Sequence, residues 1–425
     1  MRAPRQSPRL GSAVRQIGSA GAEVGQNKGV LRPYLKVLSV PGASAFSIAG
    51  VFARLPISML GLSIILMISQ LYGEYGIAGR VAAVFIAIQA ICSPQIAKLV
   101  DRHGQARIMR PAIVLHLTGL AIVATAVLLH APEWLLYLSV APAAITMGSM
   151  GAMVRARWSH ILDDPRDVHV AYSLESVFDE VTFIIGPVLA TILSTVVFPG
   201  AGILVSSLAL AIGGFIMLGQ KGTEPPPSGR DHSTKGSVMA SAAMLIVVGI
   251  FMLVGAIFGS SDVATVAFTE ARGMDGYAGA ILACFAAGSL ISGLIYGSRN
   301  WVQPVDRRFI IGVIALAIGV APLVLITSVP VLAAVMFIAG FAIAPTLISG
   351  NALVQEFVAP GRLTEGLTWV GTALGVGVAL GSSAAGSVID QFGPHGGFAS
   401  AAVAGALVVT IALIFRPALA LDRPE

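Results

Sequence analysis

The sequence predicts an all-α polytopic membrane protein with twelve transmembrane helices arranged in two six-helix bundles. Hydrophobic residues make up 56% of the 425 positions and charged residues only 11%, a balance that soluble globular domains do not show. The apolar residues fall in runs of about twenty, the length at which a helix crosses the hydrocarbon core of a bilayer. A polar, proline-rich segment separates six of these runs from the other six, which indicates two bundles joined by a linker.

Each predicted helix is one of these apolar windows. The N-terminal bundle is expected over 46–220, with windows 46–70, 77–99, 111–130, 134–156, 171–197 and 200–220. The C-terminal bundle is expected over 238–416, with windows 238–268, 277–297, 308–327, 330–357, 364–389 and 396–415. Residues 1–45 and 417–425 are expected to be tails, and residues 221–237 (KGTEPPPSGRDHSTKGS) a linker that packs no core.

Orientation follows from the positive charges. Lys and Arg in short loops resist translocation and therefore mark the cytoplasmic side. The loops on one side carry a single cation, Arg272, whereas the loops on the other side and both tails carry nearly all the rest. Both termini are therefore expected to be cytoplasmic. Because Arg greatly outnumbers Lys and the chain is rich in Ala, Gly and Val, as in GC-rich bacterial genomes, the expected location is a bacterial inner (plasma) membrane.

The placement of charged and cysteine residues excludes several classes of function. The cations lie in short connections, which argues against a nucleic-acid partner. Cys92 and Cys284 both fall in apolar windows, so neither a disulfide nor a Cys-based metal site is expected. The sequence has no pattern of a nucleophile, a metal site or a phosphate-binding loop. We therefore expect no enzyme activity, no cofactor and no bound metal.

The window 171–197 carries three acidic residues, Glu175, Asp179 and Glu180. A charged side chain at the bilayer centre costs about 2.5 to 3.5 kcal/mol on insertion scales, so these acids need a cation or a water-filled cavity. Arg54 in the first window lies at a similar depth and keeps its proton, so we expect it to pair with Asp179 or Glu180. Since one arginine cannot neutralise three carboxylates, one acid is expected to bind a proton reversibly. The alternative is that the cluster only holds the first and fifth helices together.

Two other kinds of residue in the apolar windows have more than one interpretation. Asp262 lies toward the outer end of the window 238–268, where it contacts a substrate or a proton, or caps a bent helix end. Trp134, Trp158 and Trp369 lie near predicted helix ends, so we expect them to form an aromatic belt at the membrane interface.

The connection between the second and third windows reads KLVDRHGQAR, a tight cationic turn with one acid and a glycine. With six helices on either side of a polar linker, this turn resembles the Asp-Arg-x-Gly signature of the major facilitator superfamily, and the resemblance covers essentially the whole chain. It implies that Asp101, Arg102, Gly104 and Arg107 latch the cytoplasmic ends of the two halves. The same latch would time the switch between outward-open and inward-open states.

Two further positions take a role from this resemblance. Glu365, near the start of the eleventh window, is the expected partner of the Asp101 loop when the cytoplasmic side closes. Gly186-Pro187 in the fifth window resembles the motif linked to drug and metabolite antiporters of the superfamily, and a glycine-proline step lets a helix bend. Both features would belong to conformational switching.

These observations predict a secondary active transporter that moves a small molecule by alternating access. Proton-coupled efflux of an amphipathic or cationic compound is favoured over uptake, with a small-molecule substrate, protons and membrane lipid as partners and a monomer as the functional unit. Two alternatives stay open: an importer or facilitator of a small solute without proton coupling, and a transporter-like receptor.

Overall fold

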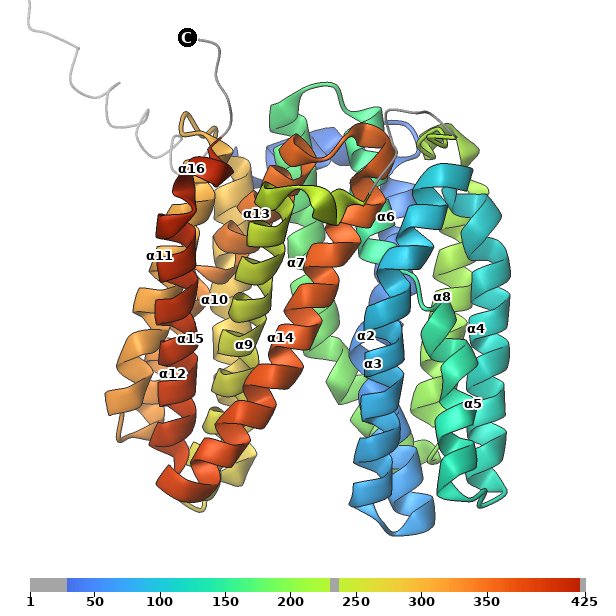
Figure 1. Cartoon of the computed structure of the whole chain (residues 1–425), viewed down its shortest axis with the longest axis vertical. Helices are drawn as coiled ribbons and strands as arrows, with labels where there is room; N and C mark the ends of the chain where they lie inside the picture. The colour runs from blue at the N-terminus through green and yellow to red at the C-terminus, as the bar shows by residue number, and fades with distance from the viewer. Residues whose placement is uncertain (1–28, 230–236, 421–425) are drawn as a thin grey trace, which may run out of the picture.

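The structure is a computed structural model that describes residues 29–229 and 237–420. Twelve helices in this part of the chain are long and apolar enough to cross a membrane, which confirms the predicted fold class (Figure 1). The N-terminal half contains α2 (Ala43–Tyr72), α3 (Tyr75–His103), α4 (Gln105–Leu128), α5 (Glu133–Thr146), α6 (Met150–Ile161), α7 (Pro165–Ile192) and α8 (Ala201–Gly219). The C-terminal half contains α9 (Ala242–Glu270), α10 (Ala278–Ser298), α11 (Val305–Val320), α12 (Val329–Gly340), α13 (Ile343–Phe357), α14 (Leu363–Phe392), α15 (Pro394–Ile414) and α16 (Arg416–Leu419).

Two spans are interrupted at corresponding places in the two halves. The predicted continuous helix 134–156 is wrong, because residues 147–149 are not helical and separate α5 from α6. In the tenth span, a turn at 341–342 separates α12 from α13. Pro142 precedes the first break and Gly148 lies within it, and both residue types weaken a helix interior. The residues after the first break therefore start a new helix.

The predicted cationic turn is much shorter than expected. α3 continues to His103 and α4 begins at Gln105, so Gly104 alone lies outside the two helices. Its φ of 96° is a conformation that glycine adopts without a steric penalty. Asp101 and Arg102 consequently lie in the last turn of α3 rather than in a loop.

Part of the predicted N-terminal tail is ordered against the opposite half. Residues 29–38 form a helix, and the Tyr34 hydroxyl donates to the carbonyl oxygens of Gly293 at 3.3 Å and Leu294 at 2.8 Å in α10. Burial raises the pKa of Tyr34 above its ordinary value, so the hydroxyl stays a hydrogen-bond donor at neutral pH. The remainder of the predicted tail, residues 1–28, lies outside the described residues.

The first part of the predicted linker also packs, contrary to expectation. Arg157 of α6 is fully buried and donates to the Gln220 carbonyl oxygen at 2.9 Å and to Thr223 Oγ1 at 2.7 Å. Glu224 Oε1 accepts from the backbone nitrogen of Ala106 at 2.9 Å. These bonds fix residues 220–224 to the N-terminal half, while residues 230–236 lie outside the described residues.

The two halves meet at one end of the molecule, which we call the linker end. There α3 and α14 lie close together, and toward the bottom of Figure 1 the same two helices diverge. A second contact joins α7 to α10, where His169 Nε2 lies 3.2 Å from the carbonyl oxygen of Tyr296. The halves are therefore joined at the linker end and splayed at the opposite end.

Within the C-terminal half, α9 and α14 pack backbone against backbone. A Cβ placed on Gly377 of α14 would lie 1.9 Å from the carbonyl oxygen of Met252 in α9, and one on Gly381 would lie 2.3 Å from that of Ala256. A Cβ on Gly375, in the same helix, would meet nothing within 4 Å. The face of α14 that contacts α9 thus requires glycine. Small residues allow this kind of close approach between membrane helices in general.

Candidate functional site

Arg54 of α2 lies between two acidic residues of α7. Its Nη2 is 2.6 Å from Glu175 Oε2, and its Nη1 is 2.9 Å from Asp179 Oδ1. Glu175 and Asp179 are four residues apart, so a helix places them on one face. The Arg54–Asp179 pair expected from the sequence is present, but Arg54 takes Glu175 rather than Glu180 as its second partner.

A second cation completes this cluster. Arg155 of α6 donates through Nη2 to Asp179 Oδ2 at 2.6 Å. Arg155 was missed in the sequence because the fourth helix was expected to end at 156, where an arginine reaches the interface. The break before α6 instead leaves Arg155 9% exposed in its side chain and turned toward α7. The four groups, which we call the charge quartet (Arg54, Arg155, Glu175 and Asp179), carry no net formal charge.

Glu175 is the most enclosed member of the charge quartet, with a fully buried side chain. Its Oε1 accepts from Ser47 Oγ at 2.6 Å and from Trp158 Nε1 at 2.8 Å, while Oε2 accepts from Arg54. The predicted belt position of Trp158 is wrong, because this ring is fully buried and lies edge-on to Phe46 at 4.8 Å. Glu175 therefore has donors on both oxygens, as buried anions generally do.

Glu180 points away from the charge quartet. Successive residues of a helix differ by about 100° in direction, and Glu180 Oε1 accepts from Ser289 Oγ of α10 in the opposite half. No Lys or Arg among the described residues forms an ion pair with Glu180. Of the three acids in the predicted cluster, Glu180 is thus the one without a cation partner among the described residues. It is also the one that bonds to the opposite half through its side chain.

The depth of these groups is greater than the sequence indicates. α7 begins at Pro165, six residues before the predicted window. At 1.5 Å per residue, Asp179 and Glu180 lie about 21 to 23 Å from the start of the helix. This places them near the middle of the fifth span, Pro165–Val197.

Asp101 joins the two halves at the linker end. Its carboxylate accepts from the backbone nitrogen of Glu365 at 2.7 Å and from that of Thr364 at 3.3 Å, both in the first turn of α14. A carboxylate at a helix N-terminus satisfies free N–H groups and opposes the positive end of the helix dipole. The Glu365 side chain binds other groups than Asp101: its Oε2 lies 2.9 Å from Arg362 Nη2, and its Oε1 accepts from the backbone nitrogen of Val238 at 3.3 Å.

The other predicted switching residues lie around this contact or along α7. Arg102 and Arg107 are exposed and form no ion pair with any described residue, so the structure does not bring them to Asp101. α7 continues through Pro187 without ending. A Cβ on Gly186 would lie 2.0 Å from Ser58 Oγ, which makes Gly186 the place where α7 approaches α2 closely.

Asp262 of α9 is half-buried and forms no ion pair or hydrogen bond with any residue that the structure describes. Its two expected roles are therefore not distinguished by its contacts. Within the same described ranges, no three His, Cys, Asp or Glu side chains are placed to hold a metal ion.

The chain matches a known protein family over nearly all of its membrane-spanning helices. A family model described as Major Facilitator Superfamily matches residues 46–308 and 277–425. A search of curated protein sequences finds no match.

Several solved structures share the fold at low sequence identity. The human organic anion transporter MFSD10 (TETRAN) is 15% identical, with a TM-score of 0.67 over 87% of this chain and 98% of that one. A bacterial homologue of the iron transporter ferroportin, in an outward-facing state, is 15% identical, with a TM-score of 0.68 over 88% and 98% of the two chains. The transporter FucP, in the outward conformation, is 17% identical, with a TM-score of 0.65 over 89% and 99%. The family match and the twelve spans together lead to one conclusion: this chain belongs to the Major Facilitator Superfamily and is a multi-pass membrane transporter, not an enzyme.

Proposed function

We propose that this protein is a proton-coupled secondary transporter of the bacterial inner membrane in which Glu180 carries the proton. The observation that supports this most directly is the difference between Glu180 and its neighbours. The charge quartet is balanced by its own two arginines, whereas Glu180 forms no ion pair with a Lys or Arg of the described residues and contacts the opposite half through Ser289. A lone carboxyl near the middle of a span is the group most able to gain and lose a proton.

The same proposal places the linker end in the cytoplasm. Basic residues gather in the described loops of this end, as the positive-inside rule requires. Because the halves are joined there and splayed at the other end, the structure corresponds to an outward-open state. Two of the compared structures, the bacterial ferroportin homologue and FucP, are described as outward-facing, which supports this assignment.

Exchange of a proton for substrate follows from the position of Glu180. In the outward-open state, the carboxyl accepts a hydrogen bond from Ser289, so the bond spans the two halves. When the halves rock, this contact must break or re-form, and the proton on Glu180 changes the energy of both states. With Glu180 ionised, the five charged groups carry a net −1, which suits an amphipathic cation as the substrate that replaces the proton. We therefore favour efflux by antiport, in agreement with the Gly186-Pro187 step.

The second candidate is a facilitator without proton coupling. Arg155 supports it, because this residue completes a neutral quartet that joins α2, α6 and α7 without any need for titration. In that case the acids are structural and Glu180 only hydrogen-bonds to Ser289.

Glu180→Gln is expected to abolish substrate-driven proton movement in proteoliposomes while counterflow of the substrate persists. The amide keeps the size of the side chain and an oxygen for Ser289, but it cannot bind a proton reversibly. The measurement uses a pH-sensitive dye inside the vesicles and a lipophilic cation, tetraphenylphosphonium, as the first probe of a panel. Glu356→Gln, an exposed acid at the linker end, is the matched control. Proton movement that survives in Glu180→Gln would contradict the proposal, and counterflow without proton movement in the parent protein would establish the facilitator.

Asp101→Asn is expected to open the linker end. The amide loses the charge that opposes the α14 dipole, an interaction of about 0.3 to 1 kcal/mol, which corresponds to a shift of about two- to fivefold in the ratio of the two states. Spin labels at the exposed positions Arg166 and Gln303, one in each half, would report the change as a longer distance in a variant that lacks Cys92 and Cys284. An unchanged distance distribution, relative to Glu356→Gln, would show that Asp101 does not hold the halves together.

A further inference from the structure

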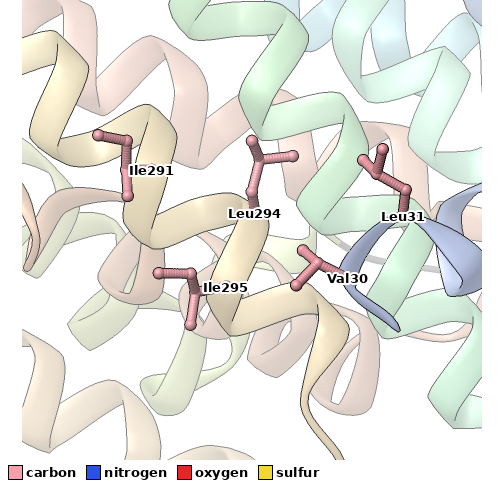
Figure 2. A pocket seen from close by; sticks show the side chains of 5 residues that line it. All are labelled: Val30, Leu31, Ile291, Leu294 and Ile295. Carbon is pink, nitrogen blue, oxygen red and sulfur yellow. The ribbon is translucent and has the colours of Figure 1, made fainter. Parts of the chain in front are cut away.

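A hollow of about 500 Å³ lies between the N-terminal helix, residues 29–38, and α10. Figure 2 shows the five side chains that line it, Val30 and Leu31 from the N-terminal helix and Ile291, Leu294 and Ile295 from α10. All five are aliphatic, and Leu31, Ile291 and Ile295 are 55%, 38% and 40% exposed. The hollow is therefore an apolar surface that no described part of the chain covers.

The hollow lies at the depth of the acyl chains next to the headgroups. Ile291 is seven residues before the end of α10 at Ser298, which corresponds to about 10 Å along the helix. Trp301, a few residues beyond the helix end, is 38% exposed, and such a ring prefers the membrane interface. An occupant of the hollow therefore has its apolar part beside Ile291 and its polar part near the end of α10.

The N-terminal helix has the pattern of an interfacial amphipathic helix. Leu31 and Leu35 are exposed on one side, and the exposed cations Arg32 and Lys36 follow each of them in sequence. Such a helix lies in the plane of the interface, with its apolar face toward the acyl chains. Lys36 is held by Asp167 at 2.7 Å, which leaves Arg32 as the unpaired cation of this helix among the described residues.

Each of the two segments that line the hollow carries an exposed arginine. Arg299 is the C-cap residue of α10, four residues after Ile295, so it lies at the end of α10 next to the hollow. Arg299 and Arg32 are both exposed, and neither forms an ion pair with a described residue. The N-terminal helix and the end of α10, which both line the aliphatic hollow, thus each carry an exposed guanidinium group, and this combination fits a phosphate group joined to an acyl chain.

We propose that an anionic phospholipid of the inner leaflet binds here, with one acyl chain in the hollow and its phosphate at Arg299 and Arg32. The N-terminal helix is joined to the first half by the Lys36–Asp167 ion pair, whereas α10 belongs to the second half. The bound lipid therefore contacts both halves beside the Tyr34 bond to α10, and it stabilises the closed linker end.

The test is lipid retention by the purified full-length chain in detergent, measured by native mass spectrometry. Phosphatidylglycerol and phosphatidylcholine with the same acyl chains are offered in equal amounts. The parent is expected to retain phosphatidylglycerol preferentially, with each arginine accounting for about a fivefold preference. Arg32→Ala with Arg299→Ala removes the charges without touching the packed interior, and Ile291→Trp fills the hollow. Both variants are expected to lose the preference.

Matched controls separate this site from general contact with lipid. Arg416→Ala removes an exposed cation at the same end, and Leu407→Trp adds a ring at an exposed aliphatic position of α15; both are expected to retain phosphatidylglycerol like the parent. Equal retention of the two lipids by the parent would overturn the proposal. So would a preference that survives in both site variants, or one that inorganic phosphate alone removes. None of these outcomes depends on Glu180 or on proton coupling.

Discussion

Arg54→Ala is expected to destabilise the N-terminal half by about 3 to 5 kcal/mol, the range for removal of one partner from a buried ion pair. The substitution leaves Glu175 without its cation, and this carboxylate is fully buried. Ser47 and Trp158 still donate to Glu175 Oε1, but they supply no positive charge to offset burial. The expected result is a large fall in the thermal unfolding temperature of the detergent-purified protein, together with loss of transport.

Two comparisons make this expectation specific. Glu175→Gln in the Arg54→Ala background removes the stranded charge, so it is expected to recover part of the lost stability. Arg80→Ala breaks the Arg80–Glu133 pair, whose side chains are 57% and 34% exposed, and exposed pairs contribute about 0 to 1 kcal/mol. If Arg54→Ala and Arg80→Ala lower the unfolding temperature equally, the charge quartet does not stabilise the fold.

Gly377→Ala is expected to destabilise the C-terminal half by about 1 to 3 kcal/mol or more, the cost of adding a methyl group to a closely packed contact. The new Cβ would lie 1.9 Å from the carbonyl oxygen of Met252. That oxygen belongs to the backbone of α9, so α9 and α14 must move apart to accept it. The measurement is again thermal unfolding, supported by the yield of monodisperse protein.

Gly375→Ala is the matched control, since it makes the same chemical change two residues away. Its Cβ meets nothing within 4 Å, and alanine has the higher helix propensity, so stability is expected to stay the same or to rise slightly. If the two substitutions have the same effect, the α9–α14 contact is not as close as the structure places it.

Hydropathy and loop charge predicted the fold well because the bilayer constrains the composition of every span and of the loops beside it. A helix must be about twenty apolar residues long and must satisfy its own backbone, so all twelve spans were visible in the sequence. The break between α5 and α6 was not, since it depends on packing around Gly148 as well as on Pro142. The helix 29–38 was also missed. Tyr34 holds this helix against α10, and the local sequence pattern does not indicate such a long-range contact.

The candidate site was predicted in part for the same reason. Acidic residues in a membrane span are conspicuous in the sequence because a charge there costs free energy of insertion. Arg54 was the cation predicted at a matching depth, so its pair with Asp179 could be predicted from the sequence. Arg155 and Trp158 looked like residues of a helix end, whereas α6 carries them into the interior beside α7. Which acid lacks a cation depends on the directions in which Asp179 and Glu180 point, and these require three dimensions.

The Asp101 contact has a consequence for how this protein can change over evolutionary time. One side of the contact is a carboxylate that a single substitution removes, but the other side includes backbone amides of α14. Every amino acid except proline supplies such an amide, so position 365 can vary freely as far as this bond is concerned. Selection on the bond is therefore recorded in only one of the two halves. Comparisons of natural variants should find a constrained acid at position 101 with no covarying residue at position 365.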